Sequence, residues 1–590
     1  MVSLENKISQ YIFCFYTERS YTSLSSGGNI DYHIKHSSHR EAGTVAEFSV
    51  LIGGKAGDGI SQAGQVIGSV FSSLGYHVYQ YVDYPSLIRG GHNFCIIRAA
   101  EYPVTAFRSG VDVIIAFDQQ TADLHKGRLS DDGIIISDAD RVKAPGLEIP
   151  LGQLINTHQG IPIMGNTAMI SALFRYLGVP WDRIEPVLKR KNPKKTEKNL
   201  EIARAAWDIL SPSRKLGIPG GSPKPFLSGN EWIGLGLLAG GLDAYVAYPM
   251  TPSSGILHFL ASIADEAGIQ VYHPESEIAV ILMALGFSYA GKKAAVGTSG
   301  GGFCLMTEGL SLAGQAEIPI VIVVSQRTGP STGLPTYTAQ SDLMFIRHAG
   351  QGEFPRWIAA PGTPEEAIFL GAEAVRIAWK FQVPAFIITD KTFSEGLFTG
   401  SADLPDLPPH RVSAPAFPYH RYEDMPDGIS PLLAPPHPGE VVKVNSYTHD
   451  FKGITTEDPQ ITIAMVEKRK RKELALKEYT DQPESVRITG NEKAPVCVIA
   501  WGSVRGQVAE IAKDTSFRFV SPLILEPFPI KTFMAALEGV DRIIVVEESA
   551  AGQIDKILKE HGIVPDEIIL RYDGRPSTIE ELETRIRRVL

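Results

Sequence analysis

Short apolar runs alternate with longer amphipathic segments near the start of the chain. Residues 48–52 form an apolar run, and residues 60–74 carry apolar side chains at helical spacing. Further strand-like runs cover residues 76–81, 113–117 and 133–137. Because strands that alternate with helices usually form parallel sheets covered by helices, the pattern predicts an α/β domain with a parallel sheet. We place this domain at residues 48–210 and expect a charged helix over 181–210 at its end.

The same alternation returns twice. A second domain is expected at 230–400, with strands at 244–247, 270–273, 293–297, 319–325 and 385–390 and helices at 277–290, 307–316 and 364–381. A third is expected at 491–590, with strands at 495–500 and 543–547 and helices at 505–514 and 552–560. The three segments share no visible tandem repeat. The predicted fold class is therefore α/β, with three Rossmann-like domains.

The segments between these domains have a different composition. Residues 211–229 are rich in Pro, Gly and Ser and read as a linker. Residues 401–490 hold a proline-dense extended connection at 404–438 and a highly charged helix at 461–481, solvated on one side. Residues 1–47 are rich in Ser, His and Gly without a clear period, so we expect a disordered leader.

Composition narrows the class of protein. The chain has 590 residues, 44% hydrophobic and 21% charged, with a net charge of -10 and no basic block that would favour nucleic acid. No apolar run reaches the roughly 20 residues that cross a bilayer. The four cysteines, Cys14, Cys95, Cys304 and Cys497, are far apart and form no Cys-x-x-Cys. This favours the reducing cytoplasm and argues against an iron–sulfur cluster on this chain alone.

Polar groups follow several of the predicted strands. The segment Tyr248-Pro-Met-Thr-Pro-Ser-Ser254 presents Thr251 and two serines after the strand at 244–247. Its prolines stop the strand, and Ser254 is a candidate helix cap. Taken alone, the segment is read more readily as a strand-to-helix capping turn than as a binding site.

Two further segments place charged side chains at the ends of predicted elements, one at the start of a helix and one after a strand. Pro274-Glu-Ser-Glu277 opens an apolar helix, where a carboxylate is favoured by the helix dipole. Spacing alone does not separate Glu275 from Glu277. Arg327 follows the apolar run 318–325, where a guanidinium can clamp a carboxylate, although a lone loop arginine is more often a surface residue. Thr298-Ser-Gly-Gly-Gly302 is either a glycine-rich turn or a place where a ligand approaches the backbone.

A glycine-rich loop, residues 53–59, follows the first strand. It includes Gly57 and Asp58, but its glycines do not have the Gly-x-Gly-x-x-Gly spacing, and it lacks the Lys-Ser/Thr ending of a P-loop. The loop is therefore a weak signal for phosphate binding, and a structural role is equally compatible with it.

Together, these segments resemble the 2-oxoacid:ferredoxin oxidoreductases, which are thiamine diphosphate enzymes. The resemblance rests on Tyr248–Ser254, on Ser-Glu-x-Ala at 276–279 and on the segment 325–343. The first domain also resembles the family's γ domain through 84–93 and 165–167, and Trp501-Gly-Ser503 resembles a turn of its transketolase C-terminal-like domain. This domain order is that of the long, fused α subunits. The departures are the leader and Met250, where the family usually has isoleucine.

The resemblance implies roles for individual residues. Thr251 and Arg327 would bind the 2-oxoacid carboxylate, and Glu277 would be the catalytic glutamate that contacts the aminopyrimidine of thiamine diphosphate, with Glu275 as runner-up. Tyr248 and Pro249 would line the thiamine pocket. In the γ-type domain, Gly57, Asp58, Ser86 and Arg89 would be contacts for coenzyme A. The C-terminal domain would be structural and would contribute to subunit contacts.

The resemblance also implies partners. Gly57-Asp58-Gly59 lies in a γ-type context, and no other Gly-Asp-Gly segment with its spaced asparagine is present to hold the diphosphate through Mg²⁺. A β subunit is thus expected to supply that half of the site and a 4Fe–4S cluster that passes electrons to ferredoxin. The family's usual assembly is a dimer of αβ heterodimers. The fused γ–α form favours oxidative decarboxylation of 2-oxoglutarate with coenzyme A, with pyruvate and other 2-oxoacids as alternatives.

Two other functions are compatible with parts of the sequence. A non-redox, transketolase-like thiamine enzyme would share the pocket but need no cluster on its partner. A nucleotide-binding regulatory protein would rest on the glycine-rich loop alone. A brown co-purified complex would exclude the first alternative. The second predicts that the purified chain binds a nucleotide without a partner and does not reduce a viologen dye with any 2-oxoacid.

Overall fold

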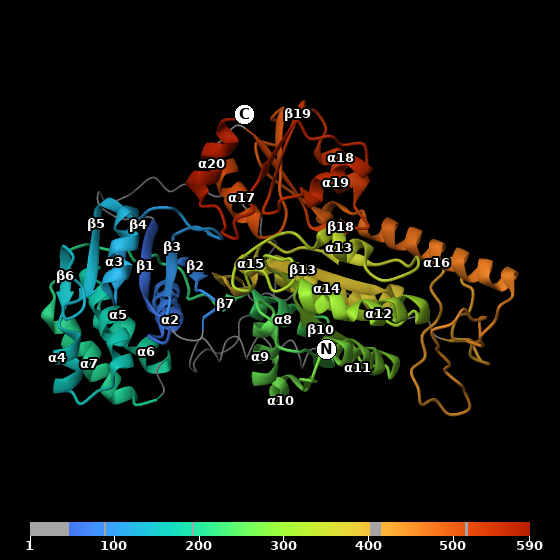
Figure 1. Ribbon diagram of the computed structural model, residues 1–590, viewed down its shortest axis with the longest axis horizontal. Helices are drawn as coiled ribbons and strands as arrows, with labels where there is room; N and C mark the ends of the chain where they lie inside the picture. The colour runs from blue at the N-terminus through green and yellow to red at the C-terminus, as the bar shows by residue number, and fades with distance from the viewer. Residues whose placement is uncertain (1–46, 88–89, 192–193, 402–414, 514–516) are drawn as a thin grey trace. The chain divides into compact units, whose positions relative to one another are not determined.

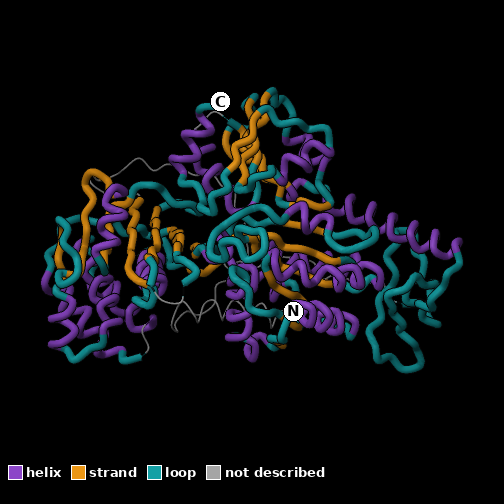
Figure 2. Tube along the Cα trace, viewed as in Figure 1, coloured by secondary structure: helices purple, strands orange, loops and turns teal. Residues whose placement is uncertain are grey.

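The computed structural model describes residues 47–87, 90–191, 194–401, 415–513 and 517–590. The chain divides into two compact units, the first made of residues up to 104 with 110–226 and the second of 105–109 with 227–590. Helices and strands alternate along both units, and Figure 2 distinguishes them by colour. The predicted leader lies almost wholly outside the described residues, and the predicted domain boundaries remain a prediction.

The first unit contains a mixed sheet with strand order β6-β5-β4-β1-β3-β2. Its strands are β1 (Glu47–Lys55), β2 (His77–Asp83), β3 (His92–Ala100), β4 (Val111–Ala116), β5 (Leu129–Asp138) and β6 (Gly146–Ile149). Its longer helices are α2 (Ile60–Ser73), α3 (Gln119–His125), α4 (Leu151–Thr157), α5 (Gly165–Tyr176), α6 (Trp181–Lys191) and α7 (Thr196–Ile209).

Three expectations for this unit were wrong. The sheet is not purely parallel, because β3 pairs antiparallel with both β1 and β2. The first strand continues through Gly53 and Gly54 to Lys55, since β3 supplies hydrogen bonds along that whole length. The single helix expected over 181–210 is two helices, because the chain turns at Lys195, whose φ of 53° lies in the left-handed region.

In the second unit, the larger sheet has the order β18-β12-β13-β11-β10-β8-β9 and is parallel except for β18. We call it the second sheet. Its strands are β8 (Ala244–Val246), β9 (Gln270–Tyr272), β10 (Ala294–Thr298), β11 (Ile320–Gln326), β12 (Trp357–Ala359), β13 (Pro384–Asp390) and β18 (Ile524–Glu526). The helices of this region are α8 (Gly229–Ala239), α9 (Ser254–Ser262), α10 (Ala264–Ala267), α11 (Glu277–Tyr289), α12 (Gly300–Ala316), α13 (Leu343–His348), α14 (Pro364–Phe381) and α15 (Lys391–Glu395). Two short strands, β7 (Phe226–Ser228) and β14 (Leu397–Thr399), flank the region.

The third sheet, with the order β15-β17-β16-β19-β20, is built from the C-terminal residues. Its strands are β15 (Val486–Gly490), β16 (Val496–Ile499), β17 (Arg518–Pro522), β19 (Arg542–Glu547) and β20 (Glu567–Leu570). Helices α17 (Arg505–Lys513), α18 (Ile530–Ala536), α19 (Gln553–Glu560) and α20 (Ile579–Arg587) accompany it, after the long helix α16 (Pro459–Thr480). In Figure 1, α16 is the long orange helix and the third sheet is red.

A continuous apolar core joins the second and third sheets. It includes Ile322 and Phe386 from the second sheet and Val520 and Val545 from the third, all fully buried. Strand β18 comes from the C-terminal region but pairs with β12, which extends the second sheet. The predicted α/β class, with mainly parallel sheets, is confirmed. The two sheets of the second unit are therefore packed as one body.

Candidate active site

The predicted site residues of the second unit lie at the carboxyl edge of the second sheet. Thr251 follows β8, and Arg327 follows β11 directly. Strand β10 lies between β8 and β11 in the sheet, so the ends of the three strands meet at one edge. The Arg327 Nη1 donates a hydrogen bond of 2.9 Å to the Thr251 carbonyl oxygen. The structure thus brings together two residues that are far apart in sequence, at the edge where such folds bind ligands.

Glu277 is the first residue of α11, and its surroundings distinguish it from Glu275. Ser276 caps the helix by accepting from the Ala279 N–H, which fixes the first turn. The Glu277 side chain is buried, with 4% of the residue exposed, whereas Glu275 is exposed. Among the described residues, Glu277 Oε1 has no hydrogen-bond partner. A buried carboxylate oxygen in that state is costly unless a ligand completes it.

The glycines after β10 explain how Glu277 fits. Gly300–Gly302 form the first turn of α12, so the glycine-rich turn, one of the two readings of 298–302, was wrong, and the helix expected from 307 begins at Gly300. The other reading, a close approach of a ligand to the backbone, stays a prediction. A Cβ at position 302 would lie 2.1 Å from Thr298 Oγ1 and 2.5 Å from Glu277 Oε1. Only glycine leaves room for the carboxylate beside the helix. Thr298 Oγ1 also approaches the Met250 sulfur at 3.9 Å, which links Glu277 to the Thr251 segment.

Asp342 is a charged residue near Arg327 that the sequence analysis did not single out. Its backbone N–H donates to Gln326 Oε1 at 2.8 Å, and its carboxylate lies where a Cβ on Gly300 would be 2.3 Å away. Burial raises the pKa of Asp342 to about 6, although Arg327 opposes the shift. Burial also lowers the pKa of Arg327, and Asp342 opposes that shift in turn. Asp342 lies in the segment 325–343, so the motif itself could have drawn attention to it.

Tyr248 and Pro249 lie between the end of β8 and Thr251. Both residues are exposed, and the Tyr248 ring packs edge-on against His273, with ring centroids 5.8 Å apart. An exposed aromatic ring is a suitable wall for a flat heterocycle. The aminopyrimidine of thiamine diphosphate is such a ring. Glu277 beside the small Gly302 could hold that ring, and the place of Tyr248 and Pro249 in the thiamine pocket remains a prediction.

The predicted coenzyme A residues of the first unit are less well defined. Gly57 has a φ of 100° and open space around it, and Asp58 accepts through Oδ2 from the Lys55 N–H at 3.1 Å. Ser86 is exposed, and Arg89 lies outside the described residues. The coenzyme A role of these residues remains a prediction.

A histidine pair next to that loop was missed by the sequence analysis. His92 pairs with Lys55 in the sheet, and its Nε2 lies 2.8 Å from His125 Nε2. Burial lowers the pKa of His92, and it lowers that of His125 to about 4. Neither Nδ1 has a partner within the described part of the chain. His92 lies in the segment 84–93, but no sequence signal pointed to His125.

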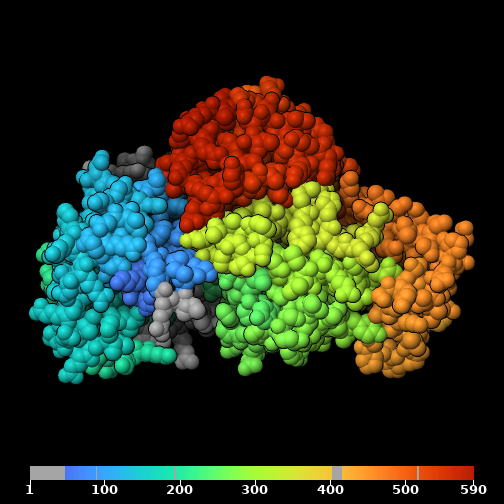
Figure 3. All heavy atoms as spheres, in the orientation of Figure 1, coloured from blue at the N-terminus to red at the C-terminus, as the bar shows by residue number. Residues whose placement is uncertain are grey.

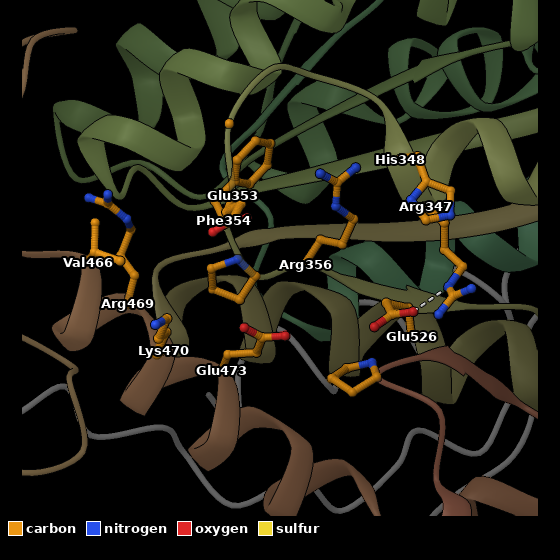
Figure 4. Close-up of a pocket in the computed structure, with 13 residues that line it drawn as sticks. Arg347, His348, Glu353, Phe354, Arg356, Val466, Arg469, Lys470, Glu473 and Glu526 are labelled. Carbon is orange, nitrogen blue, oxygen red and sulfur yellow. Dashed lines mark hydrogen bonds and ion pairs between the residues drawn. The ribbon is translucent and has the colours of Figure 1, made fainter. Parts of the chain in front are cut away.

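A separate cavity of about 500 Å³ lies in the second unit. Figure 4 shows Arg356 and Glu473 within it, with Arg347 and Glu526 joined by an ion pair at one side. Burial, then Glu526 and Glu353, raises the pKa of Glu473. None of the predicted site residues lines this cavity, and its mixed charge does not indicate a class of ligand.

Comparison with known proteins connects this site to a family. Residues 236–468 match the family described as "Pyruvate flavodoxin/ferredoxin oxidoreductase, thiamine diP-bdg", and residues 49–209 match "Pyruvate ferredoxin/flavodoxin oxidoreductase". A 2-oxoacid:ferredoxin oxidoreductase subunit alpha from Sulfolobus sp. is 30% identical, over 92% of this chain and 97% of that protein. The chain belongs to the 2-oxoacid:ferredoxin oxidoreductase α subunits.

Other relatives agree with this assignment. Subunit alpha of 2-oxoacid:ferredoxin oxidoreductase 2 from Aeropyrum pernix is 29% identical, covering 92% of this chain and 98% of that one. The 2-oxoglutarate:ferredoxin oxidoreductase from Magnetococcus marinus, solved with 2-oxoglutarate, coenzyme A and succinyl-CoA bound, has a TM-score of 0.84 at 27% identity, over 92% of this chain and 99% of that one. The chain is therefore a subunit of an oxidoreductase, with a thiamine diphosphate-binding domain. This assignment replaces the two alternatives, a non-redox thiamine enzyme and a nucleotide-binding regulatory protein.

Two observations bear on metals and membranes. Among the described residues, no cluster of three or more His, Cys, Asp or Glu side chains is arranged to hold a metal ion. In the same part of the chain, no helix combines the length and apolar character needed to cross a membrane. Cys95 and Cys497 are buried and Cys304 is exposed, all as free thiols, and Cys14 lies outside the described residues. The cytoplasmic location stays a prediction.

Proposed function

We propose that this subunit binds a 2-oxoacid through Thr251 and Arg327 and activates thiamine diphosphate through Glu277. The observation that carries the proposal is the buried Glu277 Oε1, which has no partner among the described residues and lies beside a glycine that a Cβ would block. Thiamine diphosphate, when bound, supplies the nucleophilic carbon and the electron sink for decarboxylation. The oxygen of Glu277 would hold a proton shared with the N1′ atom of the aminopyrimidine.

Arg327 would bind the carboxylate of the substrate. Its guanidinium lies at the carboxyl end of β11, and one nitrogen is already used on the Thr251 carbonyl, which fixes the plane of the fork. The remaining N–H groups can donate to a carboxylate, a geometry in which arginine is stronger than lysine. Asp342 lies close enough to influence the pKa of Arg327, so it would help hold the guanidinium in place.

The site is expected to be completed by a partner subunit. Next to Glu277, helices α11 and α12 expose a group of large apolar side chains: Ile278 at 50%, Leu282 at 48%, Met283 at 37% and Leu305 at 49%. Helices α11 and α12 pack against each other, and large exposed apolar patches mark interaction sites. We propose that a β subunit covers this surface, holds the diphosphate through Mg²⁺ and carries the 4Fe–4S cluster that reduces ferredoxin, and that two such heterodimers pair.

The preferred substrate is 2-oxoglutarate, with coenzyme A accepting the acyl group. Support comes from the Magnetococcus marinus enzyme, solved with 2-oxoglutarate and succinyl-CoA, and from the 2-oxoglutarate oxidoreductase subunit KorA of Mycobacterium tuberculosis, which is 26% identical over 92% of this chain. Pyruvate remains the alternative, since the matching families carry pyruvate in their descriptions.

The test is reconstitution. The chain expressed alone, with thiamine diphosphate, Mg²⁺ and coenzyme A, should not reduce a viologen dye with 2-oxoglutarate or pyruvate. Co-expression with its β subunit should give a brown complex that does, with kcat/KM higher for 2-oxoglutarate. Activity of the isolated chain would contradict the shared site, and higher kcat/KM for pyruvate would contradict the substrate.

A further inference from the structure

The carboxyl edge of the third sheet is filled by a glutamine from the loop that carries Arg327. Gln340 is fully buried. Its backbone N–H donates to the Glu548 carbonyl at 2.7 Å, its Oε1 accepts from the Glu548 N–H at 2.9 Å, and its Nε2 donates to the Trp501 carbonyl at 2.8 Å. All three bonds join the Arg327 loop, residues 327–342, to the C-terminal region. They hold both the backbone and the side chain of Gln340.

This contact lies at the carboxyl edge of the third sheet, where its strand order reverses. Trp501 follows β16, and Glu548 follows β19. These strands are neighbours, and β17 lies on the other side of β16, so the strand order reverses between β16 and β19. In open α/β sheets this position at the carboxyl edge usually binds the ligand. Here, Gln340 occupies the position.

Gly502 explains why the turn after β16 has its sequence. The residue has a φ of 62°, and a Cβ added there would lie 2.9 Å from Gln340 Nε2. A side chain at this position would therefore be strained by the backbone and would also press on the glutamine amide. The Trp-Gly-Ser turn is thus shaped to receive Gln340.

Further contacts hold the same loop. The Thr338 N–H donates to the Gly574 carbonyl at 3.1 Å, and the Arg575 guanidinium lies 3.6 Å from the centroid of the Tyr337 ring. Within the loop, the Thr328 hydroxyl donates to the Thr338 carbonyl at 2.9 Å. Thr328 is the residue after Arg327, so the held part of the loop is bonded directly to the neighbour of the arginine. Figure 3 shows the red C-terminal residues packed against this yellow region.

We propose that the C-terminal domain sets the position of Arg327, with Gln340 as a positioning residue for binding of the 2-oxoacid carboxylate. The domain then contributes to substrate affinity in addition to any role in subunit contacts. The inference rests on the proposed function of Arg327. It requires that loss of the Gln340 hydrogen bonds loosens the loop and weakens binding of the 2-oxoacid, while binding of coenzyme A, whose predicted contacts belong to the first unit, is unaffected.

The test compares Gln340→Ala with Gln382→Ala in the αβ complex. Gln382 is also a buried glutamine of the second unit. Its Nε2 donates to the Ser430 carbonyl and its Oε1 accepts from Arg421, so these hydrogen bonds do not involve the Arg327 loop. Gln340→Ala should raise the KM for 2-oxoglutarate about tenfold, with the KM for coenzyme A unchanged. Gln382→Ala should change neither KM. Arg575→Ala removes the contact with the Tyr337 ring and should raise the KM for 2-oxoglutarate by a smaller factor. This variant keeps the test possible if Gln340→Ala does not fold.

A second measurement separates this inference from the proposed function. Amide hydrogen exchange of residues 328–341, followed by mass spectrometry without substrate, should accelerate in Gln340→Ala but not in Gln382→Ala. Arg327→Ala should raise the KM for 2-oxoglutarate without this acceleration. Unchanged amide exchange in Gln340→Ala would overturn the positioning role. The role would also be overturned if exchange were faster in Gln340→Ala but its KM for 2-oxoglutarate were unchanged, while Arg327→Ala raised that KM. An unchanged KM in Arg327→Ala would instead overturn the function proposed for the arginine.

Discussion

Glu277 and Glu317 are both buried carboxylates of the second unit, on neighbouring helical segments, but their surroundings are opposite. Glu277 begins α11, and its Oε1 has no partner within the described residues. Glu317 follows α12 and accepts from Lys468 Nζ at 2.8 and 2.9 Å and also from Lys472. Arg421 donates to the Ala316 and Glu317 carbonyls.

The charges around Glu317 form a closed structural cluster. Burial raises the pKa of Glu317, but the charges of Lys468, Lys472 and Arg421 outweigh it and hold the pKa below its ordinary value. Burial also lowers the pKa of Lys472, to about 7, against the attraction of Glu317. These bonds fasten α16 to the C-terminal end of α12. A buried carboxylate whose hydrogen-bond partners all come from the protein stabilises the fold. A buried carboxylate with an unpaired oxygen beside a small residue instead indicates a ligand site.

The largest expected effect is on catalysis at Glu277. Glu277→Gln keeps the volume of the side chain but cannot share a proton with N1′, so kcat of the αβ complex should fall by roughly 10³-fold or more, as for loss of a general acid–base group. Hydrogen–deuterium exchange at C2 of the bound cofactor should slow to match. The exposed Glu275→Gln is the control and should leave both rates unchanged. Exchange at the normal rate in Glu277→Gln would remove Glu277 from this role.

The second prediction concerns stability at Glu317. Glu317→Gln leaves two lysines buried without their carboxylate, and breaking a buried pair costs about 3–5 kcal/mol. The free energy of unfolding should fall by that amount, while kcat of the folded complex should be unchanged. Glu467→Gln, which removes an exposed ion pair with Lys470 at 3.1 Å, should cost less than about 1 kcal/mol. Equal losses in the two variants, measured by denaturant titration, would contradict the contrast between Glu317 and Glu277.

The third prediction concerns Arg327. Arg327→Lys replaces a planar fork by a point charge and should raise the KM for the 2-oxoacid by roughly ten- to a hundredfold, or about 1.5–3 kcal/mol for a charge-assisted hydrogen bond. Stability should hardly change, because within the described residues the Arg327 side chain makes a single hydrogen bond, to the Thr251 carbonyl. The KM for coenzyme A is the internal control. A similar rise in both KM values would move Arg327 away from the substrate carboxylate.

The smallest expected effect is a pH dependence of stability, which comes from the buried carboxyl group of Glu548. Burial, then Asp390, raises the pKa of Glu548 to about 8, and its Oε2 has no partner among the described residues. A raised carboxyl pKa gives stability that is fully present below the ordinary value of about 4.3 and is lost as the pH rises towards 8, by at most about 1.4 kcal/mol per pH unit. Glu548→Gln should flatten that slope.

Thermal unfolding of the αβ complex at pH 6, 7 and 8 measures this slope. The wild-type complex should lose more stability than Glu548→Gln across that range. Glu484→Gln, at an exposed position, is the control and should follow the wild-type slope. Parallel slopes for the wild type and Glu548→Gln would show that Glu548 is already ionised in the folded chain.

Local patterns predicted much of the fold. The helices at 277 and 364 begin where expected, because Ser276 and Thr363 cap them and apolar residues follow at helical spacing. Strands such as β11 and β13 were found because parallel strands buried on both faces are continuously apolar. In contrast, β3 and its antiparallel pairing were missed. The direction of a strand depends on which neighbour it meets, and that information is not local.

The sequence by itself determined the α/β alternation, the family and the identity of Thr251, Glu277 and Arg327 as candidates. Spacing alone could not separate Glu277 from Glu275, because both lie near the start of the same helix, and the choice of Glu277 rested on the family resemblance. The tertiary structure adds that Glu277 is buried beside Gly302 whereas Glu275 is exposed. The sequence also could not reveal that Gln340 fills the edge of the third sheet or that two lysines of a charged helix are buried against Glu317. Such contacts join residues far apart in the chain, so only the packing of the sheets and helices against each other decided them.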